Sequence, residues 1–362
     1  MAVPMADPTA ELLARMPKAE LHLHLDGSLR PETALDLSRA NVIDQGLDLA
    51  GMRARLQAPE HGASQAELLR AFDLPIRLMQ DEESLERITH ELVEDVAADG
   101  TRYVEIRWAP SLHVAGGLPL PDGIAAVAEG ARRGAESTGV TVRLIAVALR
   151  SHPPQVSLAV AHAAARFMDA RLTGFDLAGY EEAFPDPIDH LDAFVAARAG
   201  GLGITIHAGE WGGASQVWRA LAVDPWRIAH GTPAADDPDL QAELIARGIT
   251  LDLCPTSNVQ AGIVPDLASH PLARLVRRGV PVTLSTDDRT VSELTLTKEY
   301  TRAVDTVGVT LSELWAMNRH ALDVAFLHDD ESRRASLIAE FDAFAESEPL
   351  LHAHASGPRA PG

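Results

Sequence analysis

The sequence predicts a closed barrel of eight parallel β-strands surrounded by helices, a (β/α)8 or TIM barrel. Eight short runs of aliphatic and β-branched residues recur along the chain, and stretches with a helical spacing of apolar residues separate most of them. The length of 362 residues and the hydrophobic content of 46% suit one large α/β domain of this kind. The predicted strands are Ala19–Leu25, Arg102–Trp108, Val140–Ala148, Leu172–Leu177, Gly203–His207, Trp226–His230, Ile249–Leu253 and Val280–Ser285.

The first of these strands carries a candidate metal-binding pair. Within Lys18–Arg30, leucines alternate with His22, His24 and Asp26, which is the period of two expected of a strand. The two histidines then point the same way, about 6.6–6.8 Å apart along the backbone. This spacing allows two imidazole nitrogens to converge on one metal ion, each about 2.0–2.1 Å from it. The alternative is a pair of buried histidines that are hydrogen-bonded to their neighbours.

The segments between the strands have the pattern of barrel helices, with two additions. The stretch Asp44–Asp99 is longer than one crossover requires, and we expect extra helices at Gln65–Gln80 and Glu82–Ala98 that cover the barrel mouth. Leu311–Phe344 is expected to add helices at the C-terminus. Barrel helices are expected at Asp122–Ser137, Gln155–Ala170, Pro238–Arg247 and Pro271–Arg278. The expected boundaries are an N-terminal extension at 1–16, the barrel at 17–345 and a disordered tail at 346–362.

Polar residues stand where several of the later strands end. His207 closes the fifth strand and Glu210 follows it in a glycine-rich turn, His230 closes the sixth, and Asp287 and Asp288 follow the eighth. Because barrel enzymes carry their chemistry at the carboxyl ends of the strands, we expect these side chains to lie together with those of the first strand. Glu210 has the alternative of stabilising a helix N-terminus. His230 has three alternatives: a fourth nitrogen ligand, a general base, or a hydrogen-bonded core histidine.

Composition excludes several classes of partner. The net charge is −21, from 52 acidic and 31 basic residues, so the surface repels phosphate backbones and anionic membranes, and we expect no nucleic-acid or membrane partner. No run of about 18 apolar residues appears, and Met1–Met16 lacks the apolar core of a signal peptide, which predicts a cytoplasmic protein. The single cysteine, Cys254, excludes both an intramolecular disulfide and a metal site built from several thiolates.

Five sequence blocks, taken together, resemble the adenosine deaminase family of metal-dependent purine deaminases. They occur in the order found in that family, and the resemblance extends from about Pro17 to Leu327. Five correlated blocks are far more specific than any one short motif. The blocks are Lys18–Arg30, His207–Glu210, Ile228–Gly231, Cys254–Gln260 and Ser285–Asp288.

The resemblance implies a cofactor and a set of residue roles. It implies one Zn²⁺ per chain, with Glu210 as the proton donor and His230 as the residue that positions and deprotonates the metal-bound water. Asp288 would accept a hydrogen bond at the five-membered ring of the purine, the Gly179 amide would meet a ring nitrogen, and Asp26 would lie near the sugar. The implied metal ligands are His22, His24, His207 and Asp287, of which Asp287 also belongs to the catalytic set. The implied substrate contacts are His24, Asp26, Gly179, Asp288, Leu69 and Phe72.

The chemistry of deamination agrees with these roles. Adding hydroxide to a 6-aminopurine requires ionised water, and binding to zinc lowers the pKa of water from about 15.7 to about 7. That difference corresponds to about 12 kcal/mol. The attack also disrupts the aromatic ring unless the adjacent ring nitrogen is protonated. A carboxylic acid whose pKa is raised in a dry pocket, as expected for Glu210, supplies that proton.

Three residues depart from the usual pattern of the family. Arg289 stands where proline is common, Tyr180 where an acid is common, and Trp211 where a small residue is usual. They are expected at the pocket rim, so they bear on which substrate binds more than on the reaction. Arg289 has two interpretations: it pairs with Asp288, or it reaches a carboxylate on a bulkier substrate.

The leading hypothesis is therefore a Zn²⁺-dependent enzyme that converts adenosine or 2′-deoxyadenosine to inosine or 2′-deoxyinosine and ammonia. An alternative keeps the chemistry but changes the substrate to 6-aminodeoxyfutalosine, adenine or another N9-substituted adenine. A catalytically silent barrel that binds a nucleoside or a partner protein is a second alternative, although every position implied for chemistry is filled. A general amidohydrolase of amide bonds is a third, and the blocks Cys254–Gln260 and Ser285–Asp288 do not support it.

Overall fold

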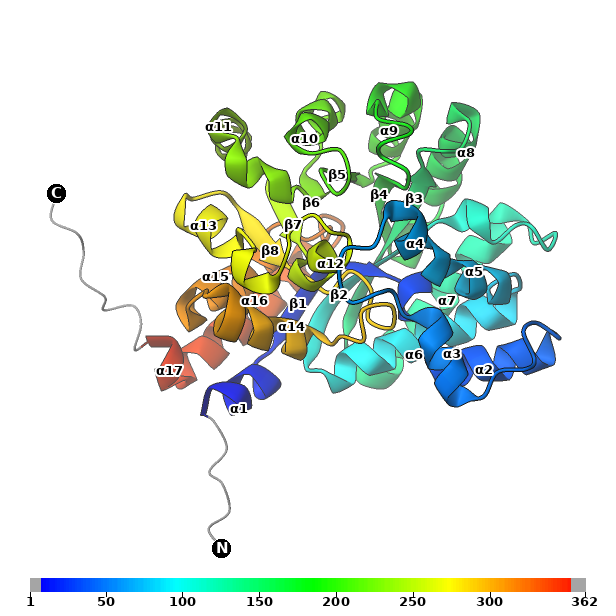
Figure 1. Ribbon diagram of the computed structural model, residues 1–362, viewed down its shortest axis with the longest axis horizontal. Coiled ribbons are helices and arrows are strands. Elements are labelled where there is room, and N and C mark those ends of the chain that lie inside the picture. Colours follow the sequence, from blue (N-terminus) through cyan, green and yellow to red (C-terminus); the bar gives the residue numbers. More distant parts are fainter. Residues whose placement is uncertain (1–7, 353–362) are drawn as a thin grey trace, which may run out of the picture.

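The computed structural model describes residues 8–352 and contains eight parallel strands that pair in sequence order, with helices around them (Figure 1). Backbone hydrogen bonds from His24 N–H to Asp287 O (2.7 Å) and from Asp287 N–H to His22 O (3.0 Å) join the first strand to the end of the last. The predicted barrel is confirmed, and each predicted strand matches to within two residues at either end. The strands are β1 (Lys18–His24), β2 (Thr101–Trp108), β3 (Thr141–Leu149), β4 (Leu172–Ala178), β5 (Gly203–Ala208), β6 (Arg227–His230), β7 (Thr250–Leu253) and β8 (Val282–Leu284).

The helices follow the expected alternation, and Figure 1 shows α8 to α11 covering one side of the strands. The helix expected at Gln65–Gln80 is divided into α4, a 3₁₀ turn at Arg70–Phe72 and α5, while the helix expected at Glu82–Ala98 is α6. The helices are α1 (Pro8–Arg15), α2 (Pro31–Ala40), α3 (Leu49–Leu56), α4 (Gln65–Leu69), α5 (Asp73–Leu78), α6 (Glu82–Ala98), α7 (Leu120–Thr138), α8 (Pro154–Ala165), α9 (Leu191–Ala199), α10 (Ala214–Ala220), α11 (Pro238–Arg247), α12 (Pro255–Gln260), α13 (Leu272–Arg277), α14 (Leu296–Arg302), α15 (Leu311–Asp323), α16 (Glu331–Ser347) and α17 (Pro349–His352).

The boundary of 346 expected for the disordered tail is wrong, because helical structure continues to residue 352. Residues 346–352 are the end of α16 and the short helix α17, and Leu351 is buried against the core. The mixed Pro, Gly and His composition of the segment conceals this local helix, which is stabilised by packing. Residues 353–362 of the expected tail and 1–7 of the expected extension lie outside the described residues. The rest of the extension forms α1, which buries Leu12 and Leu13.

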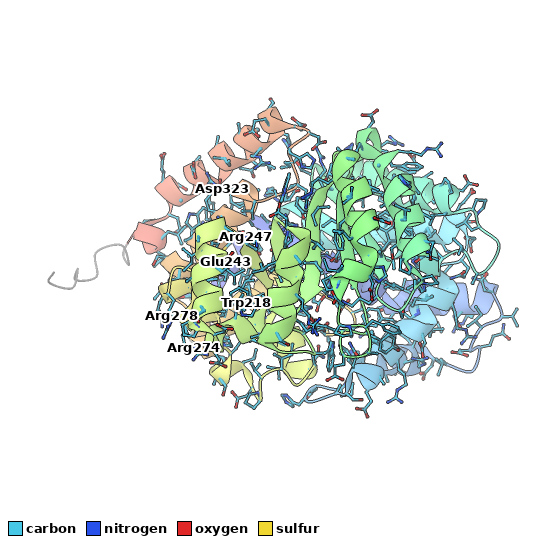
Figure 2. The ribbon with its side chains drawn as sticks, turned by 90° about the horizontal axis from the view of Figure 1, so that it is seen from above. Trp218, Glu243, Arg247, Arg274, Arg278 and Asp323 are labelled. Atoms are coloured by element: carbon cyan, nitrogen blue, oxygen red, sulfur yellow. The ribbon has the colours of Figure 1, made fainter. Side chains whose placement is uncertain are left out.

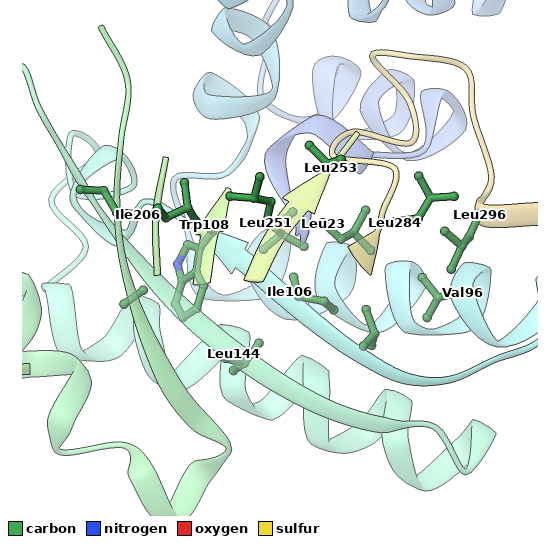
Figure 3. Packing of buried hydrophobic residues seen from close by; sticks show 14 of the residues in the cluster. Leu23, Val96, Ile106, Trp108, Leu144, Ile206, Leu251, Leu253, Leu284 and Leu296 are labelled. Carbon is green, nitrogen blue, oxygen red and sulfur yellow. The ribbon is translucent and has the colours of Figure 1, made fainter. Parts of the chain in front are cut away.

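The apolar core lies between the strands and the helices. Leu23 on β1, Ile106 on β2 and Leu251 on β7 pack in one cluster with Val96 of α6 and Leu296 of α14 (Figure 3). Both faces of a parallel sheet are covered in such a fold, so the strands are apolar runs rather than strictly alternating ones. This is why the strands were predictable from short aliphatic runs.

The barrel also buries a set of charged side chains. Arg107 on β2 lies 3.0 Å from Asp176 Oδ2 on β4 and donates to Leu21 O at 2.8 Å. Arg227 on β6 pairs with Glu105 and, at 3.1 Å, with Asp252. All five charged side chains are fully buried. Because removing one partner of a buried pair leaves an uncompensated charge, typically at a cost of about 3–5 kcal/mol, this network fixes the strands relative to one another.

The outer surface carries exposed ion pairs. On α11, Arg247 lies 2.7 Å from Asp224 and 3.8 Å from Glu243, and Arg274 on α13 lies 2.7 Å from Asp236 (Figure 2). Exposed pairs of this kind contribute about 0–1 kcal/mol each, so they matter for solubility more than for stability. Within residues 8–352, no helix is both long enough and apolar enough to span a bilayer.

Candidate functional site

A cavity of about 480 Å³ opens at the carboxyl ends of the strands. Parallel strands converge there, which explains why residues distant in sequence share it. His22 lies outside this lining set and is fully buried, in ring contact with His24 and His207. The other residues expected at the site all line the cavity: His24, Asp26, Leu69, Phe72, Gly179, His207, Glu210, His230, Asp287 and Asp288.

Three imidazoles and one carboxylate converge at this end of the barrel. His24 Nε2 lies 3.3 Å from His22 Nε2 and 3.2 Å from His207 Nε2. Asp287 Oδ1 lies 3.0 Å from His22 Nε2 and 3.3 Å from His24 Nε2. Four ligand atoms around one tetrahedral zinc ion, at bonds of about 2.0–2.1 Å, are separated by about 3.3–3.4 Å. The donor set therefore fits a single zinc-sized ion.

The electrostatics of these groups also suit a metal ion. Burial lowers the pKa of His24 to about 3 and that of His22 well below its usual value, so both imidazoles are neutral and have a lone pair to donate. Burial alone would raise the pKa of Asp287, but His22 and His230 hold it well below its usual range, so the carboxylate is charged. Asp176 Oδ2 lies 2.9 Å from His207 Nδ1, which directs the other ring nitrogen toward the cluster.

His230 belongs to the same cluster but lies slightly farther out. Four groups, His22, His207, His230 and Asp287, have ligand atoms within 4.8 Å of one another. Yet His230 Nε2 is 3.8 Å from Asp287 Oδ2, whereas His24 Nε2 is 3.3 Å from Asp287 Oδ1. The shorter separations favour His24 over His230 as the fourth ligand.

The backbone holds two of these residues in an unusual conformation. His230 has φ +64° and Asp287 has φ +67°, both in the left-handed region. For residues other than glycine this region costs about 1–2 kcal/mol, and such strain is often found at functional sites. The hydrogen bonds between Asp287 and β1 keep its side chain beside the histidines. Sequence patterns give no signal for this strain.

Glu210 lies in the turn after β5, opposite His230. Its Oε2 is 3.8 Å from His230 Nε2, and its side chain is 16% exposed. Burial, with the nearby carboxylates of Asp287 and Glu181, raises the pKa of Glu210 well above its usual range. A carboxyl group whose pKa is raised in this way is suited to donate a proton.

Glu181 is a residue that the sequence pattern did not single out. It is buried after β4 and accepts hydrogen bonds from the backbone N–H groups of Gly209 (2.7 Å), Trp211 (2.8 Å) and Gly212 (3.2 Å). These bonds fix the turn that carries Glu210. The available signal was an acidic pair directly after a strand end, which is weak without the fold.

Helix α12, which follows β7, supports two other site residues. Ser257 donates to Asp287 Oδ2 at 2.7 Å, and the side-chain nitrogen of Asn258 lies 3.1 Å from His230 Nδ1. Both side chains are buried. The block Cys254–Gln260 contributed to the family resemblance, but the sequence alone gave these two residues no role.

Two further carboxyl groups, those of Asp26 and Asp288, line the cavity. Burial raises the pKa of Asp26 to about 6, and burial together with Asp287 raises that of Asp288 well above its usual value. Oδ1 of each has no hydrogen-bond partner within residues 8–352. Gly27 packs against Asp288 so closely that a Cβ at this position would lie 1.7 Å from Asp288 Oδ1. These acids are therefore available to a ligand.

Arg289 does not take either position expected for it. Its guanidinium lies 2.6 Å from Asp99 Oδ2 in a buried ion pair, and Asp99 also accepts from Thr297 N–H at 3.2 Å. Arg289 therefore points away from both Asp288 and the cavity. Tyr180 and Trp211 do line the cavity, and Tyr180 is 40% exposed.

Comparisons with known proteins agree on one family. Residues 17–343 match the family described as adenosine deaminase. An adenosine deaminase from Enterococcus faecalis is 35% identical over 319 residues, covering 88% of this chain and 94% of that protein. An adenosine deaminase from Mycobacterium marinum is 38% identical over 353 residues, covering 92% of this chain and 96% of that protein.

Solved structures with the same fold include related deaminases. The adenine deaminase from Arthrobacter aurescens has a TM-score of 0.83 at 28% identity, covering 91% of this chain and 99% of that one. The N6-methyl-AMP deaminase from Arabidopsis thaliana has a TM-score of 0.82 at 29% identity, covering 94% and 100%. An amidohydrolase from Burkholderia ambifaria with bound Zn has a TM-score of 0.84 at 25% identity, covering 96% of each chain.

Proposed function

Because this chain belongs to the adenosine deaminase family of hydrolytic deaminases, we propose that it uses one Zn²⁺ to convert adenosine or 2′-deoxyadenosine to inosine or 2′-deoxyinosine and ammonia. The observation that carries the proposal is the convergence of three imidazole nitrogens and a carboxylate oxygen at separations of 3.0–3.3 Å. Glu210, whose pKa is raised, and His230, whose pKa is lowered, line the same cavity. A metal site, a proton donor and a neutral histidine are the groups that hydrolysis of this carbon–nitrogen bond requires.

The metal ligands in this proposal are His22, His24, His207 and Asp287. A bound zinc ion supplies Lewis acidity that brings the pKa of water close to 7. Asp176 keeps the proton of His207 on Nδ1, so that Nε2 is free to bind the metal. A neutral imidazole set with one carboxylate is a donor set that suits Zn²⁺.

The cavity residues have separate roles. Glu210 donates its proton to the purine ring nitrogen next to the carbon under attack, and His230 orients the attacking water. Asp288 forms a hydrogen bond with the five-membered ring, and the Gly179 amide contacts the six-membered ring. Asp26 lies beside the sugar. The side chains of Leu69 and Phe72, from α4 and the following 3₁₀ turn, give the base an apolar wall.

The charge of the cavity favours an unphosphorylated substrate. Of the described residues that line it, Arg70 is the only lysine or arginine, and its side chain is 65% exposed. A nucleotide phosphate is normally bound by several cationic or N–H donors. The pairing of Arg289 with Asp99 also leaves no cation there for the carboxylate of a bulkier N9 substituent.

The substrate is tested by a panel of adenosine, 2′-deoxyadenosine, adenine, 6-aminodeoxyfutalosine, AMP and N6-methyl-AMP. We expect kcat/KM for one of the two nucleosides to exceed that for the other compounds by about 10-fold or more, because each unmatched polar group costs about 1–3 kcal/mol. Loss of absorbance at the adenine band measures the rate. Better turnover of adenine, of a nucleotide or of 6-aminodeoxyfutalosine would overturn the choice of substrate but not the chemistry.

Replacing Gly27 with alanine should displace Asp288. The added Cβ would overlap the Asp288 carboxyl group, so we expect kcat/KM for adenosine to fall about 10–100-fold, the equivalent of one charged hydrogen bond. Zinc content should not change, because the added Cβ would meet atoms of Asp288 and of none of the proposed ligands. Gly46→Ala is the matched control, since a Cβ there has no atom within 4 Å. Equal activity of Gly27→Ala and the control contradicts the role of Asp288.

A further inference from the structure

A buried chain of hydrogen bonds lies behind His230, on the side away from the cavity. It runs from the backbone of α13 through His270 and Asn258 to His230 Nδ1. We propose that Asn258, oriented by His270, is a positioning residue that fixes His230 in the neutral tautomer whose proton is on Nε2. The tautomer follows from these contacts alone, and only its catalytic consequence rests on the proposed function.

The chain of hydrogen bonds starts at a backbone N–H group, which can only be a donor. The N–H of Leu272, the first residue of α13, donates to His270 Nδ1 at 3.2 Å. A nitrogen that accepts a hydrogen bond carries no proton, so the proton of the neutral His270 ring is on Nε2. His270 is buried, and burial lowers its pKa to about 3, which keeps the ring neutral. His270 Nε2 is therefore a donor.

The next link is the side-chain amide of Asn258. His270 Nε2 lies 3.0 Å from Asn258 Oδ1, and Thr232 Oγ1 donates to the same oxygen at 2.8 Å. The atom that faces two donors must be an acceptor, so it is the amide oxygen. The NH₂ group then faces His230. Asn258 is fully buried and cannot turn toward solvent.

The contact between Asn258 and His230 determines which ring nitrogen of His230 carries the proton. Asn258 Nδ2 lies 3.1 Å from His230 Nδ1, and an amide nitrogen only donates. Nδ1 of His230 is therefore the acceptor, and its neutral ring carries the proton on Nε2. That N–H points toward the metal site, 3.8 Å from Glu210 Oε2 and 3.8 Å from Asp287 Oδ2.

The consequence is a different role for His230 in the resting enzyme. A protonated Nε2 cannot bind a metal ion, which excludes His230 from the ligand set that its position also allows. Nor can it accept a proton from water. It instead donates a hydrogen bond that orients the oxygen of the attacking water toward the purine. The proton that this water loses passes to the carboxylate of Asp287, whose Oδ2 lies 3.8 Å from His230 Nε2, and from there to the departing amino group, which leaves as ammonia. This replaces the deprotonation that the family resemblance implies.

The direct test is the two-bond ¹H–¹⁵N spectrum of the zinc-loaded protein labelled with ¹⁵N-histidine. We expect His230, assigned by its loss in His230→Gln, to show the pattern of a neutral ring with an unprotonated Nδ1. A pattern with Nδ1 protonated, or with both nitrogens protonated, overturns the proposal. The spectrum is independent of turnover, so it stands even if the protein deaminates none of the purines tested.

Asn258→Asp tests the cause. One carboxylate oxygen still accepts from His270 and Thr232, but the other now faces Nδ1 as an acceptor, so His230 should move its proton to Nδ1 or become doubly protonated. We expect kcat to fall by about 10²–10⁴-fold, the range seen when a catalytic histidine is held in the wrong tautomer. Zinc content should remain near one ion per chain.

Thr232→Val is the matched control for this variant. It removes one donor to the Asn258 oxygen but leaves His270, so the tautomer of His230 should not change. An unchanged His230 pattern in Asn258→Asp, or a switched one in Thr232→Val, contradicts the role of the His270–Asn258 pair. If Asn258→Asp does not fold, the spectrum of the unsubstituted protein still decides whether Nε2 carries the proton.

Discussion

Replacing Glu210 with glutamine should lower kcat for adenosine by about 10²–10⁴-fold, the contribution expected of a general acid. Glutamine has nearly the same size and keeps the contacts of the turn, which Glu181 holds through backbone N–H groups rather than through the Glu210 side chain. It cannot release a proton to the purine ring. KM and zinc content should therefore stay close to those of the unsubstituted protein, and steady-state rates with metal analysis measure both.

Glu182→Gln is the matched control, because it makes the same chemical change at an exposed glutamate close to Glu181 in sequence. Its kcat should match that of the unsubstituted protein. Glu210→Gln with kcat within about threefold of the control would show that another group supplies the proton. The silent-barrel alternative predicts that neither variant changes anything, because there is no activity to lose.

Replacing His207 with alanine should remove both the metal ion and the activity. His207 Nε2 lies 3.2 Å from His24 Nε2, and Asp176 orients the ring, so its loss opens the proposed ligand set and leaves a buried carboxylate without its imidazole partner. Even substitutions behind a metal ligand typically cost about 10–100-fold in affinity, and loss of a ligand costs more. We expect zinc to fall from about one ion per chain to a small fraction and kcat to fall below detection.

His162→Ala is the control for His207→Ala, because His162 is exposed on α8 and remote from the cavity. Chelator treatment of the unsubstituted protein should reproduce the loss of activity, and zinc should restore it. Full activity after the metal has been removed would refute metal-dependent hydrolysis. Restoration by another divalent ion but not by zinc would instead correct the identity of the ion.

Most of the strands were predictable because they are short aliphatic runs that are buried on both sides, and the first was predictable from the alternation of its leucines with polar residues. The polar residues at their ends were predictable as a group because the barrel brings all eight carboxyl ends to one place. His207 and Asp287 are 80 residues apart in sequence, yet both line one cavity. The pattern of the strands, together with the rule that all strands of a barrel end at the same face, was therefore enough to predict that these residues lie together.

The supporting contacts were not predictable in the same way. Arg289 pairs with Asp99, and Glu181 accepts a hydrogen bond from the N–H of Gly209. No pattern in the sequence connects the two members of either pair. The helix that carries Asn258 has a recognisable sequence, but the role of its side chain depends on His270, which lies in the loop before α13. Such pairs depend on tertiary geometry. Only the structure gives the distances that decide them.

The hydrogen bonds that close the barrel join β1 to Asp287, a proposed metal ligand. In a sheet, a slip of one residue turns each side chain to the opposite face. A chain that closed one residue out of step would therefore carry its histidines away from Asp287 and have no place for the ion. Binding of the proposed metal ion would therefore depend on correct pairing of the first and last strands, and a loss of pairing there would also remove the metal site.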